Sequence, residues 1–215
     1  MPKELTNTFN FEIKDNYKEL NIYSLFPTTI GVVDCPFYKE IKKPILNFFQ
    51  ITEEKDLGFV YWPIHLQKTP IFKKLNEWIT EQVNIYSKIH KYNFEYEAGE
   101  SWLIDYQNQS HNPWHKHNGW TISTNFFLLS NKNDSHTFFR SPVYGDMLNP
   151  QNTTPLDDGN NKKYNNLTCP TFSYAPIPGR LLIFRSHTEH MADLKKTKKR
   201  VIMSYNFNPK QKKAI

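Results

Sequence analysis

Residues 112–129, near the middle of the chain, read NPWHKHNGWTISTNFFLL. This stretch combines a His-x-His pair, formed by His115 and His117, with a nearly continuous apolar run from Thr121 to Leu129. The apolar run indicates a β-strand. If the pair also lies on an extended strand, both side chains point to one face, because side chains at i and i+2 share a face. The stretch therefore predicts a β-rich core in which two imidazoles converge on one point.

Further potential ligands follow about seventy residues later, where the segment Ser186–His190 contains His187 and His190. A third imidazole from this segment would complete a facial triad and leave open positions on the metal, an arrangement that suits non-haem Fe(II). Arg200 follows ten residues after His190 and opens the strand-like run to Phe207. Its planar guanidinium matches a carboxylate, as the binding of a diacid co-substrate requires.

The order of these segments resembles that of the 2-oxoglutarate/Fe(II)-dependent oxygenases, especially small phage and bacterial members with a proximal His-x-His motif. The likeness covers about Glu100 to Asn208 and is thinner before it. It is carried by the ordered combination of several segments: the His-x-His pair, the strand Trp120–Leu129, the Gly-led strand Pro178–Phe184 before the distal histidine, a final strand from Arg200 to the aromatic-Asn pair Phe207-Asn208, and the N-terminal strand Ser24–Ile30.

The resemblance implies a set of site residues. His115, His117 and His190 would bind Fe(II), with His187 as the competitor of His190 for the distal place. The co-substrate would be 2-oxoglutarate, with O₂ and an unknown prime substrate as the other reactants, and no catalytic side chain beyond the ligands is expected. Arg200 would hold the distal carboxylate of 2-oxoglutarate, and four further residues are expected to contact the co-substrate: Tyr106, Asn125, Ser204 and Asn206. Weaker candidates for co-substrate or substrate contact are Arg140 and Arg180.

Two positions depart from the family pattern. Most members have His-x-Asp or His-x-Glu, whereas here His117 stands third, so three neutral imidazoles would leave the iron more positively charged. An alternative register uses His117 as the proximal ligand and leaves a gap at Gly119. Many relatives have a serine two residues after the arginine, where this chain has Ile202. Ser204 and Asn206 share the strand face of Arg200 and would replace that hydroxyl.

Composition bounds the remaining possibilities. The chain has 215 residues and a formal net charge of +6, with lysines gathered at 195–199 and in the tail. This basic patch is expected to be a solvated face, since no nucleic-acid motif accompanies it. Cys35 and Cys169 have no metal-site or redox spacing and are expected as reduced thiols. The N-terminus has no signal peptide and no run is long enough to span a membrane, which favours a cytoplasmic protein, in the host cytoplasm if viral.

The order of predicted elements favours a single domain over residues 1–215, with residues 1–20 as a flexible lead-in and 100–208 as the core that carries the site. Two helices are predicted, at 37–49 and 69–91. Strands are predicted at 25–33, 100–107, 121–129, 138–141, 172–175, 180–184 and 201–207. The loop 145–170 lies between the two ligand segments, and a loop of this length is expected to be either functional, as a cover of the site, or disordered. This pattern is an α+β fold, mainly β, and the resemblance implies a double-stranded β-helix (jelly roll) with the N-terminal helices packed on one sheet.

Two other functions remain open at this point. A three-histidine cupin-type dioxygenase would also carry three imidazoles on a jelly roll but would not need 2-oxoglutarate, so Arg200 would have no evident task. A non-catalytic β-sandwich binding module or virion component would use the basic surface for binding, and the histidines would be incidental.

Overall fold

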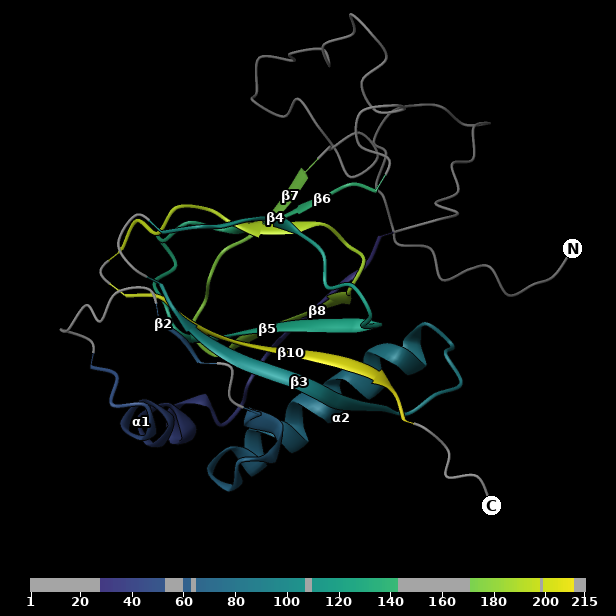
Figure 1. The fold of residues 1–215 in the computed structure, drawn as a ribbon, viewed down its shortest axis with the longest axis horizontal. Helices are drawn as coiled ribbons and strands as arrows, with labels where there is room; N and C mark the ends of the chain where they lie inside the picture. The colour runs from purple at the N-terminus through teal and green to yellow at the C-terminus, as the bar shows by residue number, and fades with distance from the viewer. Residues whose placement is uncertain are drawn as a thin grey trace, which may run out of the picture.

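The computed structural model of the protein describes residues 28–52, 60–62, 65–106, 110–142, 171–197 and 199–210. These residues form three layers, with two α-helices against a six-stranded antiparallel sheet and a four-stranded antiparallel sheet on the other side (Figure 1). The described part of the chain is mostly β, as expected. None of its helices is both long enough and apolar enough to cross a membrane.

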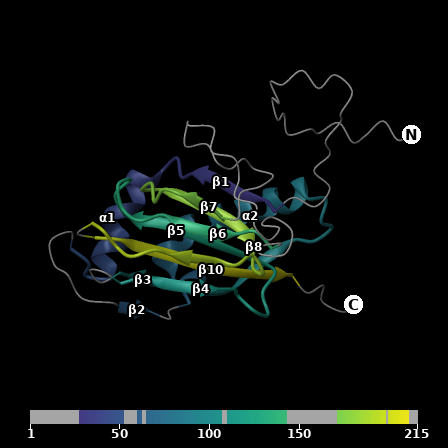
Figure 2. The same cartoon turned by 90° about the horizontal axis from the view of Figure 1, so that it is seen from above.

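The six-stranded sheet has the order β1-β8-β5-β10-β3-β2. Its strands are β1 (Ile30–Asp34), β8 (Arg180–Arg185), β5 (Ile122–Leu129), β10 (Val201–Pro209), β3 (Tyr96–Asp105) and β2 (Val60–Trp62). Figure 2 shows β1 and β2 at opposite edges, with the long strand β10 running through the middle. All five pairings are antiparallel, and β10 pairs with both β3 and β5 over most of its length.

The four-stranded sheet has the order β4-β9-β6-β7. Its strands are short: β4 (Asn112–His115), β9 (His190–Ala192), β6 (Thr137–Arg140) and β7 (Thr171–Tyr174). β4 is an edge strand, where Pro113 is tolerated because an edge residue need not donate a ladder hydrogen bond on its outer side. The register places His115 directly opposite His190.

Two helices cover the outer face of the six-stranded sheet (Figure 1). They are α1 (Tyr38–Phe48) and α2 (Lys73–Ile89), and two short 3₁₀ turns, η1 (Leu66–Lys68) and η2 (Pro70–Phe72), precede α2. The apolar stripe of α2 is buried against the sheet through Leu75, Trp78, Ile79, Val83 and Tyr86. Ile71 falls within the predicted helix 69–91 but is 46% exposed, because it lies in the 3₁₀ turn before α2 and not on the buried face of the helix.

The central strands are buried on both faces, and the two faces differ in chemistry. On β10, Val201, Met203, Tyr205 and Phe207 point into the apolar core shared with the helices. The residues that alternate with them lie on the other face, toward the four-stranded sheet. They are Ile202, Ser204 and Asn206, together with Arg200 just before the strand. Strand β5 follows the same rule with Phe126 and Leu128 toward the helices. On these two strands the polar side chains therefore face the space between the two sheets, except for Thr124 and the hydroxyl of Tyr205.

Several predicted features fall outside the described residues. They are the lead-in 1–20, the start of the strand predicted at 25–33, the covering loop 145–170 and Cys169. Cys35 is a buried free thiol. The other predicted helices and strands are present within a few residues of their expected bounds, and β2, β4 and β9 are additional strands too short for a sequence pattern.

Two glycines with positive φ give a matched test of packing at the sheet ends. Gly179 (φ +83°) is held by hydrogen bonds to Phe127 and Cys35, and a Cβ there would lie 2.7 Å from Cγ of Tyr38. Gly119 (φ +82°) has open space around the same position. We expect Gly119→Ala to cost about 1–2 kcal/mol from backbone strain alone. Gly179→Ala should cost about 1–3 kcal/mol more because of overpacking. Urea unfolding of both variants measures the difference, and equal losses would contradict the tight contact with Tyr38.

Candidate metal centre

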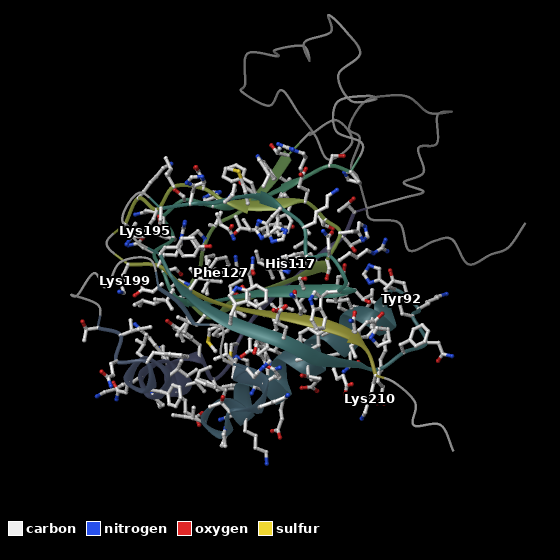
Figure 3. All side chains as sticks on the ribbon, in the orientation of Figure 1. Tyr92, His117, Phe127, Lys195, Lys199 and Lys210 are labelled. Atoms are coloured by element: carbon white, nitrogen blue, oxygen red, sulfur yellow. The ribbon has the colours of Figure 1, made fainter. Side chains whose placement is uncertain are left out.

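Three histidines meet between the two sheets. His115, His117 and His190 each offer one ring nitrogen, and these atoms all lie within 4.8 Å of one another. The ring centroids are 5.2 Å apart for His115 and His117, 4.2 Å for His115 and His190, and 5.0 Å for His117 and His190. Figure 3 shows His117 in the space between the sheets. His187 is exposed and does not belong to this cluster.

Backbone pairing positions the cluster. His115 ends β4 and His190 begins β9, and the two residues are register partners. His117 lies two residues beyond the end of β4, and the turn at Asn118 and Gly119 toward β5 follows it. The backbone N–H of His117 donates to the carbonyl of Ser186 (2.9 Å), and Gly119 with its positive φ completes the turn.

Each of the three rings has a hydrogen-bond acceptor at Nδ1. Nδ1 of His115 lies 2.7 Å from the carbonyl oxygen of Pro113, and Nδ1 of His190 lies 3.0 Å from that of Thr188. A carbonyl oxygen can only accept, so both rings donate from Nδ1 and keep the lone pair on Nε2. Metal-binding histidines typically have such a partner on the other ring nitrogen, because it fixes the tautomer and the ring orientation.

The third ring is oriented by a short polar chain. Nδ1 of His117 lies 2.6 Å from Oδ1 of Asn206, whose Nδ2 donates to Oε2 of Glu100 (3.0 Å). Because a carboxylate only accepts, Glu100 fixes which end of the Asn206 amide faces His117. The hydroxyl of Ser123 also lies 2.9 Å from Nδ1 of His117 and donates to Asn206. His117 therefore also presents Nε2 to the centre of the cluster.

Burial keeps two of the rings neutral. Desolvation lowers the pKa of His190 to about 3, with repulsion from His115 as the next cause. His190 is 2% exposed and its ring lies 4.6 Å from that of Phe184 and 5.8 Å from that of Phe139. Burial also lowers the pKa of His117, against an opposing contribution from Asn206. A neutral imidazole is the form that binds a metal, so the site is prepared for an ion at neutral pH.

A small cavity adjoins the cluster between the sheets. Three of the residues expected to contact the co-substrate line it, Tyr106, Asn125 and Ser204. The hydroxyl of Ser204 donates to Oδ1 of Asn125 (2.9 Å), so the amide inside the apolar strand β5 is paired. Asn206 was expected in this group, but its side chain is engaged by His117 and Glu100 instead.

Arg200 lies behind Tyr106 and is 1% exposed. Its Cζ is 4.1 Å from the centroid of the Tyr106 ring, and its terminal nitrogens donate to the carbonyls of Ser135 (3.3 Å) and Asp193 (2.9 Å). The carboxylate of Asp134 is 4.0 Å away. Nε of Arg200 is buried and has no hydrogen-bond partner among the described residues.

Two other arginines are committed to ion pairs. Arg180 forms a two-bond pair with Asp34 at the edge of the six-stranded sheet (2.8 and 3.0 Å), and neither residue lines the cavity. Arg140 bonds Glu189 (3.0 Å) and lies over the ring of Trp114 (4.1 Å). The expectation of a co-substrate role therefore finds no support in the position of Arg180.

The lysines at 195–199 are not uniformly a solvated face. Lys195 is 2% exposed and donates to the carbonyl of Tyr106 (2.7 Å), and Lys199 is 7% exposed and pairs with the buried carboxylate of Asp105 (2.5 Å). Both are labelled at the left of Figure 3, away from His117. These two lysines hold the end of β3 in place, and the interpretation of the run as a surface patch was wrong for them.

Sequence reasoning missed four side chains close to the cluster: Glu100, Asn112, Ser123 and Thr137. Ser123 had a usable signal, because it is a polar residue inside an apolar strand, as Asn125 is two positions later. Glu100, Asn112 and Thr137 carry no such signal, since they lie on strands whose pairing partners are far away in the sequence.

Comparison with known families decides the class of this site. Residues 100–208 match the family described as "Putative 2OG-Fe(II) oxygenase". The chain belongs to this family. It is therefore a 2-oxoglutarate- and Fe(II)-dependent oxygenase, as the resemblance of its motifs implied. A search of curated proteins finds no match to this oxygenase.

Solved structures with the same fold are distant in sequence. HygX from Streptomyces hygroscopicus, with nickel and 2-oxoglutarate bound, has a TM-score of 0.56 at 12% identity, covering 85% of this chain and 83% of HygX. The collagen prolyl hydroxylase of Paramecium bursaria Chlorella virus-1, in complex with 2-oxoglutarate, has a TM-score of 0.54 at 9% identity and covers 85% and 96%. A Pseudomonas putida prolyl-4-hydroxylase has a TM-score of 0.53 at 10% identity and covers 85% and 94%.

The amide of Asn206 gives a test of the cluster. Replacing Asn206→Ala removes the acceptor that fixes the tautomer of His117, so metal affinity should fall about 10–100-fold. Asn208→Ala is the matched control, since Asn208 lies on the same strand but bonds Thr121 and Gly119. Anaerobic titration with Fe(II) measures both. Equal affinities of the Asn206 and Asn208 variants would rule out the orienting role.

The buried neutral state of His190 predicts a pH dependence of the metal-free protein. Its pKa is about 3 in the folded chain against the ordinary value of 6.5. Between these values the unfolded chain binds more protons, so stability is full above pH 6.5 and falls as the pH is lowered toward 3. The loss from this group is at most about 1.4 kcal/mol per pH unit.

Urea unfolding across this pH range checks the prediction. The pH slope should decrease in His190→Gln and persist in His187→Gln, whose histidine is exposed. An undiminished slope in the His190 variant would show that other groups cause it.

Proposed function

We propose that this oxygenase is a hydroxylase that holds Fe(II) with His115, His117 and His190 in a double-stranded β-helix. The observation that carries the proposal is the convergence of three imidazoles whose Nδ1 atoms all face acceptors. All three rings therefore keep the lone pair on Nε2, and the ligand atoms of the cluster lie within 4.8 Å of one another. Bonds of about 2.1 Å to one ion require ligand atoms no more than about 4.2 Å apart, so a small closure of the rings suffices.

The donor set fits the metal. Neutral imidazole suits Fe(II), and three ligands leave positions for a bidentate co-substrate and O₂. When bound, iron and 2-oxoglutarate supply the oxidation of a C–H bond by O₂, with succinate and CO₂ as the products of the co-substrate. The chain's own contribution is to hold the ligands neutral, to orient them and to restrict water in the space between the sheets.

The cavity lined by Tyr106, Asn125 and Ser204 is the proposed place of 2-oxoglutarate. Its volume of about 20 Å³ has room for about one water molecule, so side chains must move to admit the co-substrate. Tyr106 lies between the cavity and Arg200, and its rotation would join the two. The buried Nε of Arg200 would then face the distal carboxylate, with Ser204 and Asn125 as further polar contacts.

Hydroxylation is the reaction we favour. Two of the solved structures with this fold are prolyl hydroxylases, from a Chlorella virus and from Pseudomonas putida. The histidines also face an open pocket large enough for a side chain or a small metabolite. The test is anaerobic addition of Fe(II) and 2-oxoglutarate, which should produce the weak visible charge-transfer band of the chelate. In air, succinate should form from 2-oxoglutarate.

Arg200 should determine the affinity for 2-oxoglutarate and not for iron. We expect Arg200→Ala to weaken co-substrate binding by about 2–5 kcal/mol, the range for removing a buried charge partner. Arg200→Lys keeps the charge without the planar fork and should lose less. Arg180→Ala is the control, because Arg180 pairs with Asp34 away from the cavity. Titration of the charge-transfer band gives the affinity. Wild-type affinity in Arg200→Ala would refute the assignment.

The third ligand is tested by two substitutions. His117→Asp restores the usual family pattern with an anionic oxygen, so this variant should keep iron and some turnover of 2-oxoglutarate. His117→Ala should lose most of its iron. Metal content after anaerobic loading and succinate formation are the measurements. If the alanine variant binds iron and turns over like the parent, His117 is not a ligand.

A further inference from the structure

A second, larger pocket of about 380 Å³ opens beside the histidines. It shares His115 and His117 with the co-substrate cavity, and four of its wall residues do not line that cavity: Glu100, Asn118, Trp120 and Asn206. Trp102 lines both spaces, with its ring 5.5 Å from that of His117. A molecule in this pocket would therefore lie next to the proposed iron, where a prime substrate must lie.

The absence of a side chain at Gly99 leaves room for the ring of Trp120. A Cβ at Gly99 would lie 2.5 Å from two atoms of the six-membered ring of Trp120. Only glycine allows this ring to lie against β3, directly beside Glu100. Trp102, at i+2 from Glu100, is on the same face of the strand. Two tryptophans thus line the same pocket as Glu100.

Glu100 is the only side chain with a formal charge among the described residues that line this pocket, and no lysine or arginine is among them. The pocket therefore differs in sign from the chain as a whole, whose net charge is +6. Asn206 donates to Oε2 of Glu100 (3.0 Å), which orients the carboxylate. A carboxylate has about four acceptor sites, so capacity remains for a ligand.

The proposed metal centre does not supply a competing charge. Three neutral imidazoles leave Fe²⁺ with two positive charges, and bound 2-oxoglutarate carries two negative ones. The positive charge of Arg200, which would face the distal carboxylate, has the negative charge of Asp134 4.0 Å away. Glu100 then remains as the formal charge beside the substrate. The faces of both indoles are also electron-rich, and cations bind within about 6 Å of such faces. All of these contributions favour a positively charged ligand over a neutral or anionic one.

We propose that the pocket of Glu100, Trp102 and Trp120 binds the prime substrate through a cationic amine or guanidinium group. The inference rests on the proposed function, since it takes the pocket to be that of the substrate. Glu100 forms the ion pair, the two indoles provide cation–π faces, and a C–H bond farther along the substrate faces the iron. The substrate class is thus a basic side chain or a polyamine-like or amino-sugar metabolite.

The test compares two probes that differ in charge and hardly in shape. Nα-acetyl-L-arginine amide and Nα-acetyl-L-citrulline amide are titrated by calorimetry into the anaerobic protein loaded with Fe(II) and 2-oxoglutarate. The arginine probe should bind about tenfold tighter, which corresponds to about 1.4 kcal/mol. In Glu100→Gln the ratio of the two affinities should fall below about twofold, and in Trp120→Leu it should fall part of the way. Because the ratio compares two probes within one variant, a change in iron affinity cancels.

Glu97→Gln is the matched control, because Glu97 is an exposed carboxylate on the same strand that does not line the pocket. It should keep the full preference. Equal binding of the two probes, tighter binding of citrulline, no binding of either at about 10 mM, or an undiminished ratio in Glu100→Gln would each overturn the inference. Failure of the charge-transfer band to form would overturn the proposed function instead. The ratio of the two probe affinities can then still be measured on the metal-free protein. Its dependence on Glu100 there tests the charge preference of the pocket independently of the metal.

Discussion

A histidine binds a metal through Nε2 only while that nitrogen keeps its lone pair, and the surroundings of each ring here enforce that condition. Two of the rings donate from Nδ1 to carbonyl oxygens close in sequence, those of Pro113 and Thr188. The third, His117, depends on Asn206, and Asn206 depends in turn on Glu100. The tautomer of His117 is thus fixed by groups on β3 and β10, so these strands must keep their register for the three rings to cluster in this form.

The central strands of the six-stranded sheet carry different kinds of side chain on their two faces. Strands β5 and β10 present mainly large apolar residues to the helices. To the space between the sheets they present short polar residues together with Phe127 and Ile202. The polar residues there are paired with one another, as Ser204 is with Asn125. Burial of unpaired polar groups would be costly, so the network around the histidines is also what makes a polar centre tolerable inside the protein.

Sequence patterns predicted what depends on local spacing. The helix at 69–91, the long central strands and the identity of the clustered histidines could all be found without coordinates. The convergence of His115 and His117 was predicted for a pair on an extended strand; the two histidines do converge, although β4 ends at His115 and His117 follows two residues later. The bond from His117 to Asn206 joins residues 89 positions apart, and no local pattern encodes such a contact. For the same reason the inward direction of Lys195 and the placement of Arg200 behind Tyr106 required the structure.

The pairing of β6 with β7 holds together the two ends of the connection between these strands. The chain leaves the four-stranded sheet after Arg140 and re-enters it at Thr171, its register partner. The neighbouring pairing of β6 with β9 sets the position of His190 whatever sequence joins the two points. Lengthening a connection between fixed ends costs little, since the closure entropy grows only with the logarithm of its length. The connection between β6 and β7 can therefore change in length or sequence at little cost while His190 keeps its place beside β6.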